Sequence, residues 1–553
     1  MEFLSKGGYA EVFYDRSRRD IYRRMPRRNQ EQKQLDVSSF TDLVFTRTFE
    51  HTGCTPVIYG EQISKDFVSY RMPHYGISLH KWVRQENMNT RKRYAPYILL
   101  QIVLACIHFE KNGFFHSDIK PLNIMIETVY GNRNEDEGAA GSTKPEQDNG
   151  SSDDSNSHAN SHANSDDYDQ YYDIEDMGGS RSPRDSIQQL KVRVIDFNCS
   201  SIKTIDHKNQ AREWSYGIGT WHYMPPEIIL QEMPYDNSAS WTIGVLAAYI
   251  IDAYPFADII KNRTEKALLE QETWKELLNE CAAANHEHIF LSRNRFYSDP
   301  WHELIYHCTH WRSANRWSLH SIYKYLYENL MNHNSHHASY IVAPSLLADI
   351  SPIEHMIEIA NSAILPKEQR TSVINKMYTM CENMDKMTLF PTAVAIFDRA
   401  LGEIGMDFVG KTWQLAAGSY LLSCFMNSVS ILSSRTYMSR LLNTFSCINR
   451  TQALAALCYI GQLLSWKLWE KPSHIIVVEA DASLRWDRSL FEHIRVVLVD
   501  AQGSYTQQRI AQEVLRRIRT PTATVTVLLP DHPPEVMPIM RRQTTGEYRQ
   551  HGW

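Results

Sequence analysis

The sequence lacks three features that would identify a secreted or membrane protein. Its nine cysteines are scattered singly, without the paired spacing of a disulfide framework. Its longest apolar runs, at residues 243–251 and 415–426, are too short to span a bilayer. The first residues, MEFLSKGGYAEV, lack the charged and then apolar pattern of a signal peptide. We therefore expect an intracellular protein, and its 553 residues predict two or three domains.

Acidic charge is concentrated in one segment. Residues 130–186 hold fourteen acidic and four basic residues, so this segment carries about −10 and the rest of the chain about +4. The segment has few large aliphatic side chains and contains an imperfect Ser-His-Ala-Asn repeat. Because it cannot bury enough apolar surface to offset the entropy of ordering, we expect a disordered insertion. Its acidity argues against a nucleic-acid partner, and we predict no membrane partner.

The order of strand-like and helix-like patterns predicts an α+β protein. The runs YAEVFYD, DIYRRM and FVSYRMP are rich in aromatic and β-branched residues and are typical of strands. Helical spacing of apolar residues begins near Ala95 and stops at Gly113. Two further strand-like runs, NIMIE and LKVRVIDFN, lie on either side of the acidic segment, and helical segments follow up to about residue 330.

The second half of the chain is helical in pattern. After a linker at residues 331–350, helical segments begin with IEHMIEIANSAI and include QRTSVINKMYTMCENM and FPTAVAIFDRALGEIG. Residues 476–553 combine two strand-like runs, IRVVLVDA and TATVTVLLP, with the helical run TQQRIAQEVLRRI. The pattern assigns no role to this last segment.

The stretch HSDIKPLNIMI places an acid, a lysine and an amide close together in a loop, at Asp118, Lys120 and Asn123. A second acid, Asp196, follows the strand-like run VRVI. Phosphoryl transfer from ATP needs a carboxylate to accept the hydroxyl proton, a cation near the γ-phosphate and ligands for magnesium. Asp118 and Lys120 suit the first two roles. Asn123 and Asp196 are hard oxygen donors that suit Mg²⁺.

Five motifs occur in the order SKGGYAEV, HSDIKPLN, DFN, GTWHYMPPE and ANRWS. In this order they resemble a eukaryotic-type serine/threonine protein kinase domain. The resemblance implies a bilobal domain over residues 1–330, interrupted by the insertion at 130–186, with ATP and Mg²⁺ as cofactors and proteins as substrates. It also implies a buried ion pair between Glu227 and Arg316.

The same resemblance implies which residues bind the nucleotide phosphates. They lie on the first motif and on the strand that follows it: Ser5, Lys6, Gly7, Gly8, Ala10, Val12 and Arg23.

The chain departs from the kinase pattern at several positions. Ser5 and Ala10 replace the first and third glycines of the phosphate-covering loop, and small residues there still permit close approach of the backbone. Ser117 replaces the usual arginine before the base, and Asn198 replaces the glycine of the metal-binding turn. Ala239 stands where an aspartate normally braces the catalytic loop.

The departure with the greatest consequence is Arg23, which stands where the family has a lysine that pairs with a helix glutamate. Arginine keeps the charge, but it is longer and planar, so Arg23→Lys is predicted to raise turnover unless the site has adapted to arginine. The acidic partner of Arg23 is either Asp42 or Glu31. Lys6 is an alternative contact to the phosphates.

FPTAVAIFDRAL, WQLAAGSYLLSC and LLSWKLWEKPS resemble parts of a cyclin box, which we place at residues 351–475; a generic helical bundle is the alternative. Cyclins contact their kinases through a lysine and a glutamate. The matching positions hold Phe425 or Met426, and Leu457 or Cys458. We therefore expect the helices to pack against the protein's own kinase lobe or against an apolar host regulatory partner.

The sequence is compatible with two functions. The first is a serine/threonine protein kinase, and the second is a pseudokinase and cyclin-like scaffold without catalysis. The combination of domains resembles genes of large DNA viruses, which implies the host cytoplasm or nucleus as the location.

Overall fold

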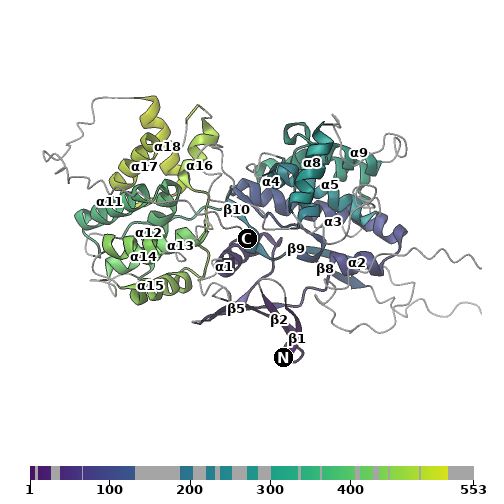
Figure 1. The fold of residues 1–553 in the computed structure, drawn as a ribbon, viewed down its shortest axis with the longest axis horizontal. Helices are drawn as coiled ribbons and strands as arrows, with labels where there is room; N and C mark the ends of the chain where they lie inside the picture. Colours follow the sequence, from purple (N-terminus) through teal and green to yellow (C-terminus); the bar gives the residue numbers. More distant parts are fainter. Residues whose placement is uncertain are drawn as a thin grey trace, which may run out of the picture.

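A computed structural model describes residues 1–6, 10–26, 38–64, 66–130, 187–202, 220–230, 237–251, 271–283, 300–333, 338–339, 341–360, 364–404, 411–426, 435–445, 449–481, 483–484 and 487–520. The described chain forms three parts, which Figure 1 shows as a sheet at the bottom, one group of helices at the right and another at the left. Helix α1 (Ser38–Phe49) lies between them.

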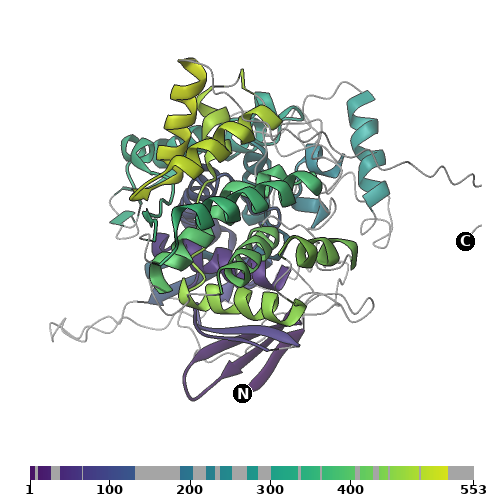
Figure 2. The ribbon, with the colours of Figure 1, turned by 90° about the vertical axis from the view of Figure 1, so that its left-hand side faces the viewer.

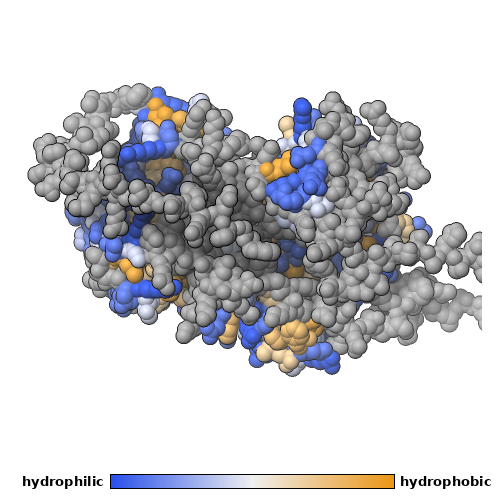
Figure 3. All heavy atoms as spheres, in the orientation of Figure 1, coloured by the Kyte–Doolittle hydropathy of each residue, from blue (hydrophilic) through white to orange (hydrophobic). Residues whose placement is uncertain are grey.

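The N-terminal part is a five-stranded antiparallel sheet with the order β1-β2-β3-β5-β4. Its strands are β1 (Glu2–Lys6), β2 (Glu11–Asp15), β3 (Asp20–Pro26), β4 (Tyr59–Ile63) and β5 (Phe67–Pro73). Burial alternates along β2, so one face of the sheet covers α1 and the other faces solvent. The three strands expected from YAEVFYD, DIYRRM and FVSYRMP are confirmed. An apolar patch lies over the β1–β2 edge (Figure 3), where Phe3 is 56% exposed.

The middle of the chain is built around the long helix α3 (Met88–Lys111), which is buried along most of its length. The Asn87 side chain caps its start by accepting a hydrogen bond from Thr90 N, and Gly113 follows its end with a φ of 69°. The short elements packed around it are β6 (Ile77–Ser78), α2 (Leu79–Gln85), β7 (Phe114–Phe115), β8 (Ile124–Tyr130), β9 (Ile187–Val194) and β10 (Ser201–Ile202).

Strands β8 and β9 pair as an antiparallel hairpin, and the acidic segment connects them. The expected disorder of that insertion falls on residues 131–186, which lie outside the described residues.

The right-hand helices in Figure 1 cover α3 on the side away from the sheet. They are α4 (Pro226–Ile229), α5 (Ser238–Ile250), α8 (Gln271–Ala283), α9 (Pro300–Cys308) and α10 (Leu319–Tyr325). Arg316 donates two hydrogen bonds of 2.8 Å to the carboxylate of Glu227, and both residues are buried. The expected ion pair between these residues is present.

The C-terminal part is mainly helical, and its helices lie across the front of the molecule in Figure 2. They are α11 (Lys367–Asn383), α12 (Phe390–Ile404), α13 (Thr412–Met426), α14 (Arg435–Thr444), α15 (Arg450–Leu463), α16 (Ser473–Ala480), α17 (Arg488–Asp500) and α18 (Gln507–Arg519).

Two predictions for this part are wrong. IEHMIEIANSAI is not a helix over its described residues, because β11 (Ile357–Glu358) pairs with β12 (Ser504–Tyr505) instead. The strand-like run IRVVLVDA lies in α17, whose buried residues recur at helical spacing and whose start is capped by Asp487. The helix expected from TQQRIAQEVLRRI is confirmed as α18, and TATVTVLLP lies outside the described residues.

One continuous apolar core joins the sheet, α1, α3 and the C-terminal helices. Within the described ranges, none of the helices combines the length and hydropathy that a membrane span requires.

Candidate active site

The loop at residues 116–123 brings three of the predicted residues together. Lys120 Nζ lies 2.9 Å from Asp118 Oδ2, and Asn123 Nδ2 donates to the same oxygen at 3.0 Å. Asn123 Nδ2 also donates to the Asp118 backbone oxygen at 2.9 Å, which closes the loop on itself. The Asp118 carboxylate is therefore held by charge-assisted hydrogen bonds in one orientation.

Thr220 completes the contacts of this carboxylate. Its backbone nitrogen and its hydroxyl donate to Asp118 Oδ1 at 3.1 and 3.2 Å, and its Oγ1 accepts from Lys120 Nζ at 3.0 Å. Burial alone would lower the pKa of Lys120, but the negative charges of Asp118 and Asp196 raise it above its ordinary value, so the lysine stays charged.

Asp196 heads the second segment, the turn at residues 196–198. Its φ is 70°, a left-handed conformation that an aspartate adopts only where the surroundings hold it. Arg23 Nη2 and Asn198 Nδ2 both donate to its Oδ1, at 2.6 and 2.5 Å. Burial would raise the pKa of Asp196, but the charges of Arg23 and Lys120 lower it below its ordinary value, so the carboxylate is ionised.

Backbone and imidazole contacts fasten the loop to the turn. Ile195 N donates to Asn123 O at 3.0 Å, and His116 Nε2 contacts Ile195 O at 3.1 Å. Ser200 Oγ donates to His116 O at 3.1 Å. Burial lowers the pKa of His116 to about 4, so its imidazole is neutral and donates from Nε2 to the carbonyl. The 116–123 loop and the turn at residues 196–198 therefore lie side by side in one site.

Arg23 connects the sheet to this site and to α1. Its Nε lies 3.3 Å from Asp42 Oδ2, while its Nη2 contacts Asp196. Asp42 is fully buried and also accepts hydrogen bonds from Tyr70 Oη and Phe197 N, both at 2.7 Å. Of the two acids left open by the sequence, Asp42 is thus a partner of Arg23; Glu31 lies outside the described residues.

One arginine serves two carboxylates in this arrangement. Burial and the nearby charge of Asp196 raise the pKa of Asp42, whereas Arg23 opposes that rise. The guanidinium of Arg23 is thus the cation that both carboxylates contact.

Aromatic rings pack beneath the two segments and tie them to α1. Phe45 and Phe114 lie 4.1 Å apart, and His116 and Phe197 lie 4.7 Å apart, between ring centroids. The other contacts of the cluster join Phe49, Phe109, Phe114 and Phe197. A displacement of α1 would therefore shift the packing of both the 116–123 loop and the 196–198 turn.

The structure describes the predicted phosphate-binding residues only in part. Gly7 and Gly8 lie outside the described residues, and Ser5 and Lys6 are described only as backbone in β1. Val12 is buried and pairs with Arg23 in the β2–β3 register, and Ala10 is buried just before β2. Val12 therefore lies beside the arginine, and the placement of the Lys6 side chain relative to it is outside the description.

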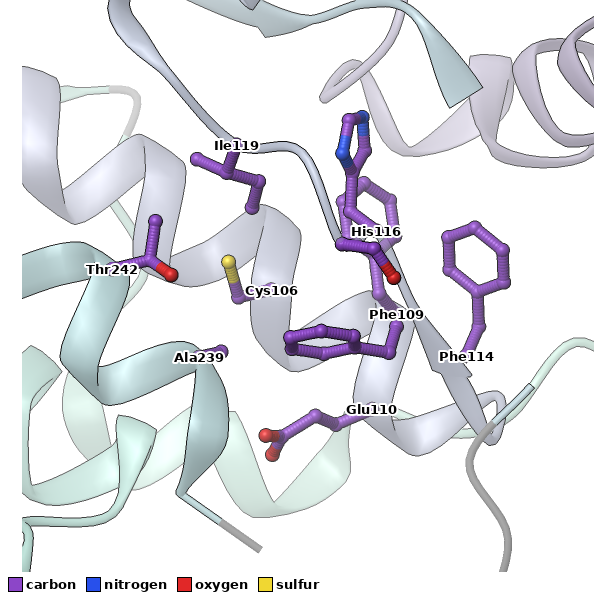
Figure 4. A pocket seen from close by; sticks show the side chains of 10 residues that line it. Cys106, Phe109, Glu110, Phe114, His116, Ile119, Ala239 and Thr242 are labelled. Atoms are coloured by element: carbon purple, nitrogen blue, oxygen red, sulfur yellow. The ribbon is translucent and has the colours of Figure 1, made fainter. Parts of the chain in front are cut away.

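A small pocket lies behind the 116–123 loop (Figure 4), where the family pattern has its charged brace. Ser117, Ala239, Thr242 and apolar side chains of α3 line it, and it has room for about one water molecule. Ser117 has a φ of 65°.

Sequence reasoning missed two contributors, Thr220 and Tyr70, and one contact of a residue that it identified, Asn198. Thr220 stands within the motif GTWHYMPPE, so its position was a usable signal. Tyr70, which orients Asp42, lies in a strand without any motif. Asn198 was noticed as a replacement for glycine, but its hydrogen bond to Asp196 could not be foreseen from the sequence.

Comparison with known families gives a match to part of the chain. The model of the protein kinase domain matches residues 185–328, which include Asp196, Thr220, Glu227 and Arg316. The similarity to a protein kinase domain is therefore found for residues 185–328. A comparison with curated proteins finds no match.

Proposed function

We propose that the protein is a serine/threonine protein kinase that transfers the γ-phosphoryl group of ATP to hydroxyl groups of proteins. The observation that carries the proposal is the contact network of the site: Asp118 is held by Lys120, Asn123 and Thr220, and Asp196 is held by Arg23. The kinase-domain match over residues 185–328 supports it.

Asp118 acts as the base in this proposal. The substrate hydroxyl oxygen bonds to the γ-phosphorus while the bond from that phosphorus to the β,γ-bridging oxygen breaks, and the hydroxyl proton passes to Asp118. Lys120 is charged and lies 2.9 Å from the base, so it can also offset the charge of the transferring group. ADP leaves with the electron pair of the broken bond.

The residues present fit a magnesium ion. Asp196 is ionised, and Asn123 supplies an amide oxygen, so both are hard donors. Asn198 adds a buried Oδ1 that has no hydrogen-bond partner in the described part of the chain. Asn123 and Asp196 would hold the ion, which would supply positive charge to offset that of the phosphates.

The preference for serine and threonine rests on the position of Lys120 in the sequence. A hydrogen bond to Thr220 keeps this lysine beside the base. This lysine lies two residues after the base and before a proline, which resembles the serine/threonine pattern.

Labelled ATP with Mg²⁺ and a general acceptor protein tests the proposal, with Asp118→Asn as the matched control. Transfer to serine and threonine that disappears in the variant supports it. Absence of transfer by the unaltered protein contradicts it.

The alternative is a scaffold without catalysis. Its supporting observation is that Arg23 and Asn198 both donate to Asp196 Oδ1, one of the two carboxylate oxygens that could hold a metal. A nucleotide-dependent rise in melting temperature without transfer would indicate a pseudokinase that binds nucleotide. Absence of both would indicate a scaffold that does not.

A further inference from the structure

Helix α1 is enclosed by two different parts of the protein. All residues from Phe40 to Phe45 are buried, although the helix contains threonine and aspartate among its apolar residues. One side of the helix faces the active site through Asp42 and Phe45. The helix has 12 residues, and isolated helices of that length are marginal in water, so its neighbours determine where it lies.

The C-terminal helices supply the other neighbour. Phe425, at the end of α13, stacks on Phe40 with 4.8 Å between ring centroids and 21° between ring planes. Thr41 Oγ1 donates to Phe425 O at 3.2 Å. Phe40, Thr41 and Asp42 are consecutive, so contacts to the C-terminal part and to the active site arise from adjacent residues.

The turn after α15 places a second aromatic ring against α1. The Trp466 ring lies 6.1 Å from that of Phe40. Ser465 and Trp466 have positive φ values of 51° and 59°, which side-chain-bearing residues adopt only where packing enforces them. The fit depends on Gly461, because a Cβ there would lie 2.3 Å from the Trp466 ring.

The same turn reaches α3. The Trp469 ring lies 5.5 Å from that of Phe45, and its indole nitrogen donates to Asn112 O at 3.1 Å. Asn112 Oδ1 also accepts from Ile353 N at 2.8 Å. The C-terminal part therefore contacts both α1 and the end of the helix that precedes the 116–123 loop.

We propose that the C-terminal helices are a built-in positioning element of the catalytic unit. Phe425 and Trp466 hold α1 so that Asp42 can engage Arg23, Tyr70 and Phe197. They are positioning residues, because they act through Asp42. The inference rests on the proposed kinase function for its kinetic consequence, but the physical claim concerns the placement of α1 alone.

Two Phe→Ala variants test the proposal in the full-length chain. Phe425→Ala removes the ring that stacks on Phe40 of α1. Phe390→Ala is the matched control, because Phe390 is equally buried in the same part and its ring contacts Tyr378 in α11. Hydrogen exchange of residues 38–49 and of the Phe197 amide is measured with each variant. We expect faster exchange in Phe425→Ala and unchanged exchange at these sites in Phe390→Ala.

The kinetic measurement uses Asp42→Asn as a second background. Phe425→Ala is expected to lower kcat/KM for ATP by about tenfold, the loss of roughly one charge-assisted hydrogen bond, mainly through KM. In Asp42→Asn it should cause no further loss, because the route of its action is already removed. An equal loss in both backgrounds, or equal exchange in the two Phe→Ala variants, would overturn the proposal.

Two provisions keep the outcome decisive. If Phe425→Ala does not fold, Thr41→Val, which removes the hydrogen bond to Phe425 O, is measured in its place. If the unaltered protein transfers no phosphate, the kinase proposal fails. The exchange experiment still decides whether the C-terminal helices hold α1.

Discussion

Replacing Arg23 by lysine and Asp42 by glutamate, the residues that the kinase resemblance implies, tests whether the site has adapted to arginine. In Arg23→Lys, the ammonium nitrogen takes the place of the guanidinium carbon, about 1.3 Å short of Nη2. The 2.6 Å contact with Asp196 then opens. Loss of a charge-assisted hydrogen bond costs about 1.5–3 kcal/mol, or roughly ten- to a hundredfold in kcat/KM for ATP. From the structure we therefore expect Arg23→Lys to lower turnover, whereas the sequence alone predicts an increase.

The second half of the cycle lengthens the acid. Asp42→Glu alone adds a methylene at a fully buried position and should also lower activity, since overpacking costs about 1–3 kcal/mol. With Arg23→Lys, however, the longer acid meets the shorter cation. We expect the double variant to recover at least about tenfold over Arg23→Lys. Steady-state kinetics and melting temperatures measure all four proteins.

Two results would refute this reasoning. Arg23→Lys at or above the activity of the unaltered protein would show that arginine is a handicap. A double variant no better than the product of the single losses would show that the two side chains are not coupled.

Three further predictions concern the loop, the helices and pH. Thr220→Val should lower kcat about tenfold with little change in KM for ATP, and Thr220→Ser should retain activity, as steady-state kinetics would show. Arg316→Met should cost about 3–5 kcal/mol in urea unfolding because it leaves the buried Glu227 carboxylate without its cation, and adding Glu227→Gln should recover part of the loss. Burial lowers the pKa of His116 and His355 to about 4 and that of His474 to about 3. Below pH 6.5 the unfolded chain therefore binds more protons than the folded chain, so stability should fall as the pH drops from 6.5 toward 4. His474→Leu should reduce that slope by about 1.4 kcal/mol per pH unit in denaturant titrations, while Glu470, whose pKa burial raises to about 7, acts in the opposite direction.

Residues close in sequence were predictable where the chemistry is local. Asp118, Lys120 and Asn123 span six positions of one loop, and hydrogen bonds within that loop bring their polar atoms together. The partner of Arg23 was not decidable, because it depends on how α1 is rotated against the sheet. Packing of the whole helix sets that rotation, and spacing along the chain does not encode it.

The run IRVVLVDA shows a second limit of sequence reasoning. Its β-branched residues favour a strand by propensity, yet Phe491, Ile494, Val497 and Leu498 are buried on one side of α17. Tertiary burial outweighs a propensity difference of about 1 kcal/mol or less per residue. The helix prediction for IEHMIEIANSAI is wrong for the opposite reason. Part of this run forms a strand because β12, which lies far along the chain, pairs with it.

Asp42 takes the role that the kinase resemblance implies for a glutamate, and this shorter acid is physically connected with the position of the C-terminal helices. Aspartate is one methylene shorter than glutamate, so it has fewer rotatable bonds with which to follow a moving cation. The Asp42–Arg23 contact is 3.3 Å long, and a retreat of α1 by about 1 Å would take it beyond the roughly 4 Å limit of an ion pair. A short acid therefore functions only on a helix whose position is fixed. Phe425 and Trp466 pack on that helix directly beside the acid, so the substitution at the active site and the apolar contact outside it depend on each other.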